Sequence, residues 1–367
     1  MIPALESIDW HSFLDRPPLV SLPDSVAASL ANEPILITGA GGSIGSALAH
    51  RLGAAGARLI LLEASESNLF DLQSELSIYS PSQPPAFYLG STSDRPLLEE
   101  IFRHHRPQPI FHAAAFKHVP LLEEQPFAAI DNNVIGTRAL VTCAAAHGAR
   151  ILLLSTDKAV MPAALMGATK RVAEQIVLAA GGTVLRLANV LGSRGSVADV
   201  FARQIATGAP LTVTDPAARR YFLTIAEAVD LLLAATGERN ASALFVPQLR
   251  ATHYIADLAR FMARTLAPDR AIPIEFTHLR AGDKEAEALY SPIETPHSPS
   301  ANGLVPVDSP RLPAHHLRDL LEALKDHSES RDLAAAISVL RRLVPDYTPS
   351  RALEAVLTKT EPPVHNV

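Results

Sequence analysis

One stretch near the start of the chain combines an apolar run, a glycine-rich turn and the beginning of a helical pattern. The run at 35–38 leads into Gly39, Gly42 and Gly45, and a helical pattern covers 43–52. Glycine permits a tight turn and a close approach of the backbone, and a helix N-terminus offers free N–H groups to a pyrophosphate. A glycine pattern alone is weak evidence, but the strand before it and the helix after it predict a dinucleotide site.

The same rhythm of short apolar runs and helical patterns continues to about residue 188. This alternation is typical of a parallel sheet with crossover helices, so we predict an α/β fold with a Rossmann-type doubly wound sheet. The expected strands are 35–38, 58–63, 86–89, 109–112, 151–155 and 183–187. The expected helices between them are 43–52, 65–76, 96–104, 126–146 and 165–179.

Beyond this region the alternation loosens. We expect helices at 196–207, 225–235, 313–325 and 332–343, short strands at 244–246 and 274–277, and a Pro/Ser-rich crossing segment at 291–310. The predicted organisation is an irregular N-terminal arm with one short helix (1–32), a dinucleotide-binding domain (33–188), a smaller α/β substrate-binding lobe interleaved with it (mainly 189–300) and a C-terminal helical segment (301–367).

Composition excludes several classes of protein. The 367 residues are 48% hydrophobic, enough to bury a full core. A net charge of -6, without a long run of Lys or Arg, argues against nucleic acid or an anionic membrane surface as the principal partner. The single cysteine, Cys143, excludes an intrachain disulfide. No apolar run reaches the roughly 18 residues of a membrane helix and no signal-peptide pattern opens the sequence, so we expect a cytoplasmic protein.

An acidic residue ends the second expected strand. Glu63 stands where a carboxylate accepts hydrogen bonds from the adenosine ribose, and it would repel a 2′-phosphate. The next residue is Ala64 and no arginine is adjacent, so we predict NAD rather than NADP. The alternative is a solvated acid at a strand end. The turn at 90–94 follows the third strand and is a candidate contact for adenine.

Three alanines and two titratable side chains follow the fourth expected strand. Ala113 and Ala114 let the backbone lie against a flat cofactor. Lys117 and His118 then stand at the carboxyl end of the sheet, where α/β folds bind ligands. Lys117 is a candidate for holding a phosphate or a sugar hydroxyl, or else a surface lysine. For His118, packing and ligand binding are equally good interpretations.

The segment 155–170 carries the reactive groups. It resembles the short-chain dehydrogenases, in which Ser or Thr at a strand end precedes a helical Tyr-x-x-x-Lys. Thr156 and Lys170 match, but Met166 stands at the tyrosine position, and its thioether cannot donate a proton. Either the protein is inactive, or a neighbouring group performs the proton transfer.

These stretches together strongly resemble the nucleotide-sugar 4,6-dehydratases of bacterial capsule, flagellar and protein-glycan synthesis, most of all the soluble catalytic portion of their large membrane-anchored members. Thr-Asp-Lys followed by Met-Gly-Ala-Thr-Lys is specific to this family, including its methionine. The matching stretches are 16–18, 39–45, 112–120, 132–137, 155–158, 166–170, 192–196, 220–225 and 343–347.

Two positions depart from the family pattern. Members usually carry Asp where Ser91 stands, which weakens the expected adenine contact. The family's Leu-Arg-Pro-Gly-Glu-Lys appears at 279–284 as Leu-Arg-Ala-Gly-Asp-Lys, so the substrate side is altered.

The resemblance implies a reaction in which NAD takes a hydride from C4 of a UDP-hexose, water leaves across C5 and C6, and the hydride returns to C6. For it we assign Thr156 to O4, Lys158 to the C5 proton and Asp157 to the departing hydroxyl. These roles need a neutral Lys158, favoured by burial and by Lys170 nearby, and a protonated Asp157, favoured by burial. An ion pair between them would oppose both, and a purely structural pair is the alternative.

Two further groups of residues are assigned to binding, and we expect no metal site. UDP-N-acetylglucosamine is the expected substrate, and arginine forks suit its diphosphate. A homo-oligomer is expected. A 4-epimerase, which would normally keep tyrosine at position 166, and a non-catalytic NAD sensor are the alternatives. The cofactor group is Gly39, Gly42, Ser43, Ile44, Gly45, Glu63, Ala113, Ala114, Met166 and Lys170, and the substrate group is Lys117, Asn189, Arg194, Ser196, Arg220, Arg280 and Lys284.

Overall fold

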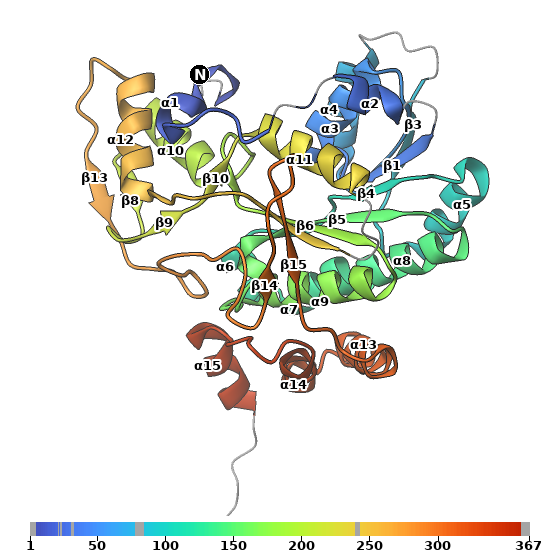
Figure 1. Ribbon diagram of the computed structural model, residues 1–367. Helices are drawn as coiled ribbons and strands as arrows, with labels where there is room; N and C mark the ends of the chain where they lie inside the picture. The colour runs from blue at the N-terminus through green and yellow to red at the C-terminus, as the bar shows by residue number, and fades with distance from the viewer. Residues whose placement is uncertain are drawn as a thin grey trace, which may run out of the picture.

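A nine-stranded sheet runs through the computed structural model, which describes residues 5–360 except 21, 23, 31–32, 78–83 and 239–242 (Figure 1). Its order is β14-β15-β11-β6-β5-β4-β1-β2-β3. The strands from β11 to β3 are parallel, whereas β15 and β14 add antiparallel pairs at one edge. The strands are β1 (Pro34–Thr38), β2 (Arg58–Glu63), β3 (Ala86–Leu89), β4 (Ile110–His112), β5 (Ile151–Thr156), β6 (Thr183–Leu187), β11 (Leu244–Pro247), β14 (Thr295–Pro296) and β15 (Leu304–Asp308).

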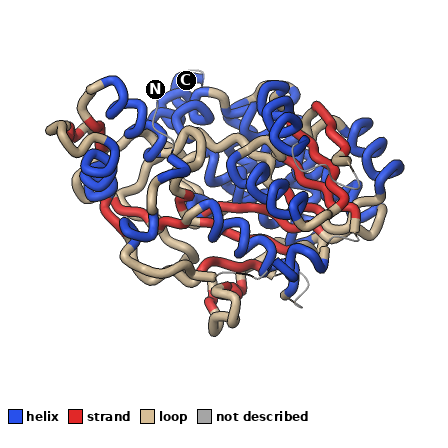
Figure 2. The backbone as a smooth tube through the Cα atoms, turned by 90° about the horizontal axis from the view of Figure 1, so that it is seen from above, coloured by secondary structure: helices blue, strands red, loops and turns tan. Residues whose placement is uncertain are grey.

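The predicted doubly wound α/β fold is confirmed, and the first six expected strands occur within one residue of their expected ends. Strands buried on both faces read as continuous apolar runs, as Ile35, Leu36 and Ile37 do at 0% exposure. Helices cover both faces: Figure 1 shows the strands between an upper and a lower layer of helices, and Figure 2, seen from above, shows helices lying across the strands. One layer contains α2 (Asp24–Ser29), α3 (Ser43–Ala54), α4 (Glu66–Leu76) and α11 (Ile225–Gly237), and the other contains α5 (Arg95–His105), α8 (Gly136–Ala146) and α9 (Leu165–Ala179).

The helix expected at 126–146 is correct in extent but not in type. It consists of α7 (Pro126–Ile130), a π-helical turn (Asp131–Ile135) and α8, and the unexpected α6 (Val119–Glu124) precedes it. Within the π-helical turn, Asn133 Oδ1 accepts the Phe116 N–H (2.8 Å) and Asn133 Nδ2 donates to Thr169 Oγ1 (3.2 Å). The turn thus joins the loop after β4 to α9.

A smaller lobe lies beside the sheet, with α1 (Trp10–Leu14), α10 (Val197–Thr207) and α12 (Ile255–Leu266) packed together (Figure 1). The sequence analysis missed α12, although Leu258, Ala259 and Met262 form its buried face. The arm holds a 3-10 turn (Leu5–Ser7), α1 and α2 rather than one short helix. The lobe's strands are β7 (Asn189–Val190), β8 (Leu211–Val213), β9 (Arg219–Arg220), β10 (Phe222–Leu223), β12 (His253–Tyr254) and β13 (Ile274–Phe276).

Three C-terminal helices, α13 (Ala314–Glu329), α14 (Leu333–Leu343) and α15 (Arg351–Thr360), lie below α9 in Figure 1. The expected crossing segment 291–310 is not irregular throughout, because it contains β14 and β15. Leu304 and Val307 are buried against β11, a long-range pairing that outweighs the local proline content. Within the described ranges, no helix has the length and apolarity that a membrane crossing needs. The domain boundaries and the homo-oligomer stay predictions.

Candidate functional site

The glycine turn between β1 and α3 is built so closely that side chains are excluded from it. Gly39 has φ of +67°, and a Cβ there would lie 2.7 Å from Ala114 Cα. At Gly45 a Cβ would lie 2.2 Å from the Gly39 carbonyl oxygen. The turn therefore packs against the backbone after β4, where Ala113 donates its N–H to Thr38 O (3.0 Å).

The α3 N-terminus opens directly from this turn. Gly42 is its N-cap and provides no side-chain hydrogen bond, so the amides at Ser43, Ile44 and Gly45 face outward at the positive end of the helix dipole. Ser43 Oγ accepts the Arg194 N–H (2.9 Å), which brings the substrate-side segment to this point. An uncapped helix after a close glycine turn fits the pyrophosphate of a dinucleotide.

The carboxylate of Glu63 is 9% exposed and already has two partners. Its oxygens accept the N–H groups of Gly41 (2.9 Å) and Ser65 (3.0 Å), so it supports the glycine turn from below. An ionised carboxylate has about four acceptor positions, which leaves capacity for ribose hydroxyls. The solvated acid considered as an alternative is wrong, because the side chain is buried.

His112, the last residue of β4, has one defined tautomer, which its hydrogen bonds determine. Thr137 Oγ1 donates to Asn133 O (2.7 Å), so it must accept from His112 Nε2 (2.9 Å), and Nδ1 then accepts from Thr38 Oγ1 (2.7 Å). Burial, aided by the charge of Lys170, lowers the pKa of His112 to about 3. This histidine therefore stays neutral and supports structure rather than chemistry.

Lys117 and Arg194, both predicted to bind substrate, lie in contact with each other. Lys117 Nζ donates to Arg194 O (2.6 Å), and burial lowers the pKa of Lys117. His118 packs its ring over Gly195, where a Cβ would lie 2.6 Å from the ring, and burial followed by the charge of Lys117 lowers the pKa of His118. Ser196 caps α10 by accepting the Asp199 N–H (3.4 Å).

The reactive segment forms a 3-10 turn (Asp157–Ala159) at the end of β5. Asp157 Oδ1 accepts from Thr156 Oγ1 (3.0 Å) and from Lys158 Nζ (3.0 Å), and Lys158 Nζ also donates to Asn189 Oδ1 (2.8 Å). Asp157 is fully buried, and its Oδ2 has no hydrogen-bond partner among the described residues. The Lys158 side chain is 26% exposed.

The pair geometry that the sequence left open is therefore an ion pair. The two side chains are in direct contact, which is the arrangement considered above as the alternative to their proton-transfer roles. Lys158 lines a small cavity together with Met166, whereas Asp157 does not. Lys158 is therefore accessible to a molecule in this cavity, whereas Asp157 is buried and does not contact the cavity.

Helix α9 packs directly on this turn. A Cβ at Gly167 would lie 2.1 Å from Lys158 O, so glycine is required next to Met166. Lys170 donates from Nζ to Leu154 O (2.7 Å). Burial lowers the pKa of Lys170 to about 8 against the opposing charge of Glu174. The helix thus presents Met166 and Lys170 at the carboxyl end of β5, as the sequence predicted.

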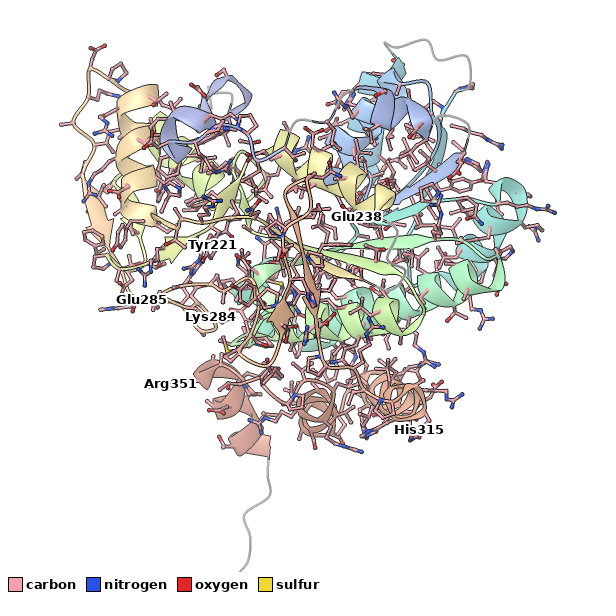
Figure 3. All side chains as sticks on the ribbon, in the orientation of Figure 1. Tyr221, Glu238, Lys284, Glu285, His315 and Arg351 are labelled. Atoms are coloured by element: carbon pink, nitrogen blue, oxygen red, sulfur yellow. The ribbon has the colours of Figure 1, made fainter. Side chains whose placement is uncertain are left out.

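Residues 280–287, here called the covering segment, close this cavity from the side of the smaller lobe; Figure 3 labels Lys284 and Glu285 on it. A Cβ at Gly282 would lie 2.7 Å from Ala164 Cβ, and Lys284 Nζ donates to Val160 O (2.7 Å). The enclosed volume of about 10 Å³ does not exceed that of one water. In this structure the covering segment therefore leaves no room for a hexose beside Lys158 and Met166.

The predicted diphosphate arginines are engaged differently from one another. Arg220 donates to the carbonyls of Lys284 (2.6 Å) and Glu285 (2.8 Å), so it holds the covering segment. Arg280 is 60% exposed and pairs with Asp283 (2.8 Å). The stretch from Arg280 to Lys284 is not helical. Sequence reasoning also missed Arg186, whose only signal was a charge inside the apolar strand β6.

The doubly wound sheet, the glycine turn and the Thr156–Lys170 arrangement define an extended short-chain dehydrogenase/reductase fold. The structure of Pen from Bacillus thuringiensis matches with a TM-score of 0.69 and 26% identity, over 77% of this chain and 88% of that one. Residues 35–305 match the family described as polysaccharide biosynthesis protein.

Relatives with known names agree with this match. The probable polysaccharide biosynthesis protein EpsC of Bacillus subtilis is 36% identical over 79% of this chain, and a UDP-glucose 4-epimerase of Rickettsia rickettsii is 33% identical over 72% of this chain and 79% of its own length. The chain spans only 50% of the length of EpsC. The chain belongs to the polysaccharide biosynthesis protein family.

Proposed function

We propose that the protein is an NAD-dependent 4,6-dehydratase of a UDP-linked hexose, with UDP-N-acetylglucosamine as the candidate substrate, in polysaccharide or glycan synthesis. The observation that carries this proposal is the Asp157–Lys158 pair, 3.0 Å apart, beside a methionine where a tyrosine would otherwise serve. An acid and a base next to each other are what an elimination across C5 and C6 needs. Family membership supports the sugar-nucleotide class of substrate.

The proposed roles keep protons balanced. Bound NAD supplies a hydride acceptor at C4 that returns the hydride to C6. Thr156 hydrogen-bonds O4, neutral Lys158 accepts the C5 proton, and Asp157 gives a proton to the departing C6 hydroxyl. Proton transfer across the 3.0 Å Nζ–Oδ1 contact interconverts the ion pair and the neutral pair. The elimination then leaves the ion pair, and the proton on Lys158 passes to C5 when the hydride returns. The O4 hydroxyl proton leaves to solvent as C4 is oxidised, and one proton from solvent restores the Asp157–Lys158 pair after each turnover.

Asp157 needs access that the closed cavity does not provide. A hexose enters this cavity only after the covering segment moves, and in this proposal the same movement also exposes Asp157 to the substrate. Its unpartnered Oδ2 is the atom available to a hydroxyl.

An epimerase is the second candidate, supported by the name of the Rickettsia relative. An epimerase would normally keep a tyrosine at position 166 and needs no acid–base pair for an elimination, whereas this chain has Met166 and the Asp157–Lys158 pair. A non-catalytic NAD sensor would bind cofactor without turnover.

We expect UDP-N-acetylglucosamine deuterated at C4 to yield a 4-keto-6-deoxy product deuterated at C6, because one hydride passes from C4 to C6 on the same enzyme. Turnover in heavy water should place deuterium at C5 unless the base is shielded. Mass spectrometry and NMR locate the labels. An epimerase would return the label to C4 and leave C6 oxygenated, a sensor would return unchanged sugar, and loss of the label to free cofactor would mean net oxidation.

We expect NAD to bind at least about tenfold more tightly than NADP, since the Glu63 carboxylate at the end of β2 would face a 2′-phosphate. Calorimetry with both cofactors measures the ratio of the two dissociation constants, and Glu63→Gln should bring this ratio closer to one. Equal or reversed affinities in the wild type would remove this role from Glu63.

A further inference from the structure

Four charged side chains form a cluster between β6, α9 and the segment before β14, here called the buried charge cluster: Arg171, Glu174, Arg186 and Glu294. The side chains of Glu174, Arg186 and Glu294 are 0% exposed and that of Arg171 is 8% exposed. Two guanidinium groups and two carboxylates make the cluster neutral. Burial alone would raise the pKa of Glu294, but the hydrogen bonds and charge of Arg186 lower it to about 2, so the cluster stays ionised.

Arg186 uses all its N–H groups. Nε and one Nη2 hydrogen bond Glu174 (2.8 Å each), the second Nη2 hydrogen and one of Nη1 bond Glu294 (2.8 Å each), and the remaining Nη1 hydrogen bonds Leu289 O (3.2 Å). A guanidinium group has five donors, and no other side chain can reproduce this set. Arg186, on β6, therefore joins α9 to the segment before β14 through two carboxylates and one backbone carbonyl.

One side of the cluster reaches the reactive turn. Glu174 Oε1 accepts from Ser155 Oγ (2.6 Å), and Ser155 immediately precedes Thr156. Glu174 also lies one helical turn after Lys170 on α9. Glu174 thus contacts the strand end that carries the reactive residues and lies on the same helix as Lys170.

The other side reaches the covering segment. Leu289, whose carbonyl Arg186 binds, is two residues past Glu287, the end of that segment. Glu294 Oε2 accepts the Ser291 N–H (2.9 Å), which fixes the chain immediately beyond. Arg220 and Lys284 hold the covering segment itself through contacts with backbone carbonyls, whereas the Arg186 side chain is fully buried.

We propose that Arg186 is a positioning residue that sets the covering segment relative to the reactive turn and thereby the affinity for the sugar nucleotide. The inference rests on the proposed function. A purely stabilising ion pair would need the carboxylates but not the Leu289 carbonyl. Leu289 lies two residues beyond the covering segment, and Arg186, not Arg171, donates to its carbonyl.

Comparing Arg186→Lys with Arg171→Lys tests this directly. Each variant removes one guanidinium from the same cluster and keeps its charge. Arg186→Lys leaves three donors for five contacts, and because the two carboxylates are stronger acceptors than a neutral carbonyl, the Leu289 carbonyl loses its donor. Arg171→Lys leaves the Arg186 contact with Leu289 in place. We expect Arg186→Lys to raise KM for UDP-N-acetylglucosamine about tenfold, with kcat within about threefold and unchanged NAD affinity. Arg171→Lys should leave KM within about twofold.

Limited trypsin digestion supplies a readout that does not depend on turnover. Cleavage after Arg280 and Lys284, followed by mass spectrometry, should be about tenfold faster in Arg186→Lys than in the wild type and nearly unchanged in Arg171→Lys. Equal KM values and equal cleavage rates in the two variants would overturn the proposal.

Two further results are informative. If the wild type does not turn over UDP-N-acetylglucosamine, the proposed function fails, while the cleavage rates still test the positioning role. If Arg186→Lys does not fold, Glu294→Gln keeps the side-chain volume, turns one acceptor toward Arg186 into a donor, and should show the same faster cleavage. Unchanged cleavage in folded Glu294→Gln would contradict the proposal.

Discussion

Replacing Lys158 by alanine is expected to lower kcat about a thousandfold and to leave NAD affinity within about threefold of the wild type. Lys158 is the member of the reactive pair that lines the cavity, and its Nζ contacts Asp157 and Asn189 but none of the glycine turn. Formation of the 4-keto-6-deoxy product, followed by its alkaline absorbance, measures turnover, and calorimetry measures NAD binding.

Lys158→Arg is the matched control for the ion pair. It keeps a cation beside the buried Asp157 carboxylate, whereas alanine leaves that carboxylate uncompensated, so its thermal midpoint should lie above that of Lys158→Ala. Because a guanidinium group does not lose its proton in proteins, Lys158→Arg should still be inactive. Substantial activity in either variant would show that Lys158 is not the base.

Replacing Gly45 by alanine is expected to weaken NAD binding by about a hundredfold or more. A Cβ at this position would lie 2.2 Å from the carbonyl oxygen of Gly39, which is backbone and cannot rotate away. The first turn of α3 would have to separate from the glycine turn, and the amides at the helix N-terminus would move with it. Calorimetric titration with NAD measures the loss.

Gly53→Ala on the same helix is its control. A Cβ there would meet only Leu59 and Leu76 side-chain carbons at 3.6 Å, an ordinary contact, so NAD affinity should not change. Gly→Ala within a helix generally stabilises by about 0.5–1 kcal/mol, and the thermal midpoint of Gly53→Ala should rise. Similar NAD affinities in Gly45→Ala and Gly53→Ala would mean that the glycine turn does not hold the cofactor.

The features that the sequence determined by itself are those that local chemistry specifies. Apolar runs of strand length, such as 35–38, cannot face water on either side, so they predict a sheet covered by helices on both faces. Gly39 and Gly45 predict a close turn because only glycine tolerates the backbone contacts that are found there. The order Thr156, Met166 and Lys170 likewise places one strand end against one helix.

Only the tertiary structure decided which charges meet. Lys158 reaches Asn189 and Arg186 reaches Glu294, partners 31 and 108 residues away along the chain. The sequence alone does not distinguish a lysine or arginine that faces water from one that faces a buried carboxylate. The free energy of a buried ion depends on its desolvation and on its partners, and both are set by segments that pack together only when the whole chain folds.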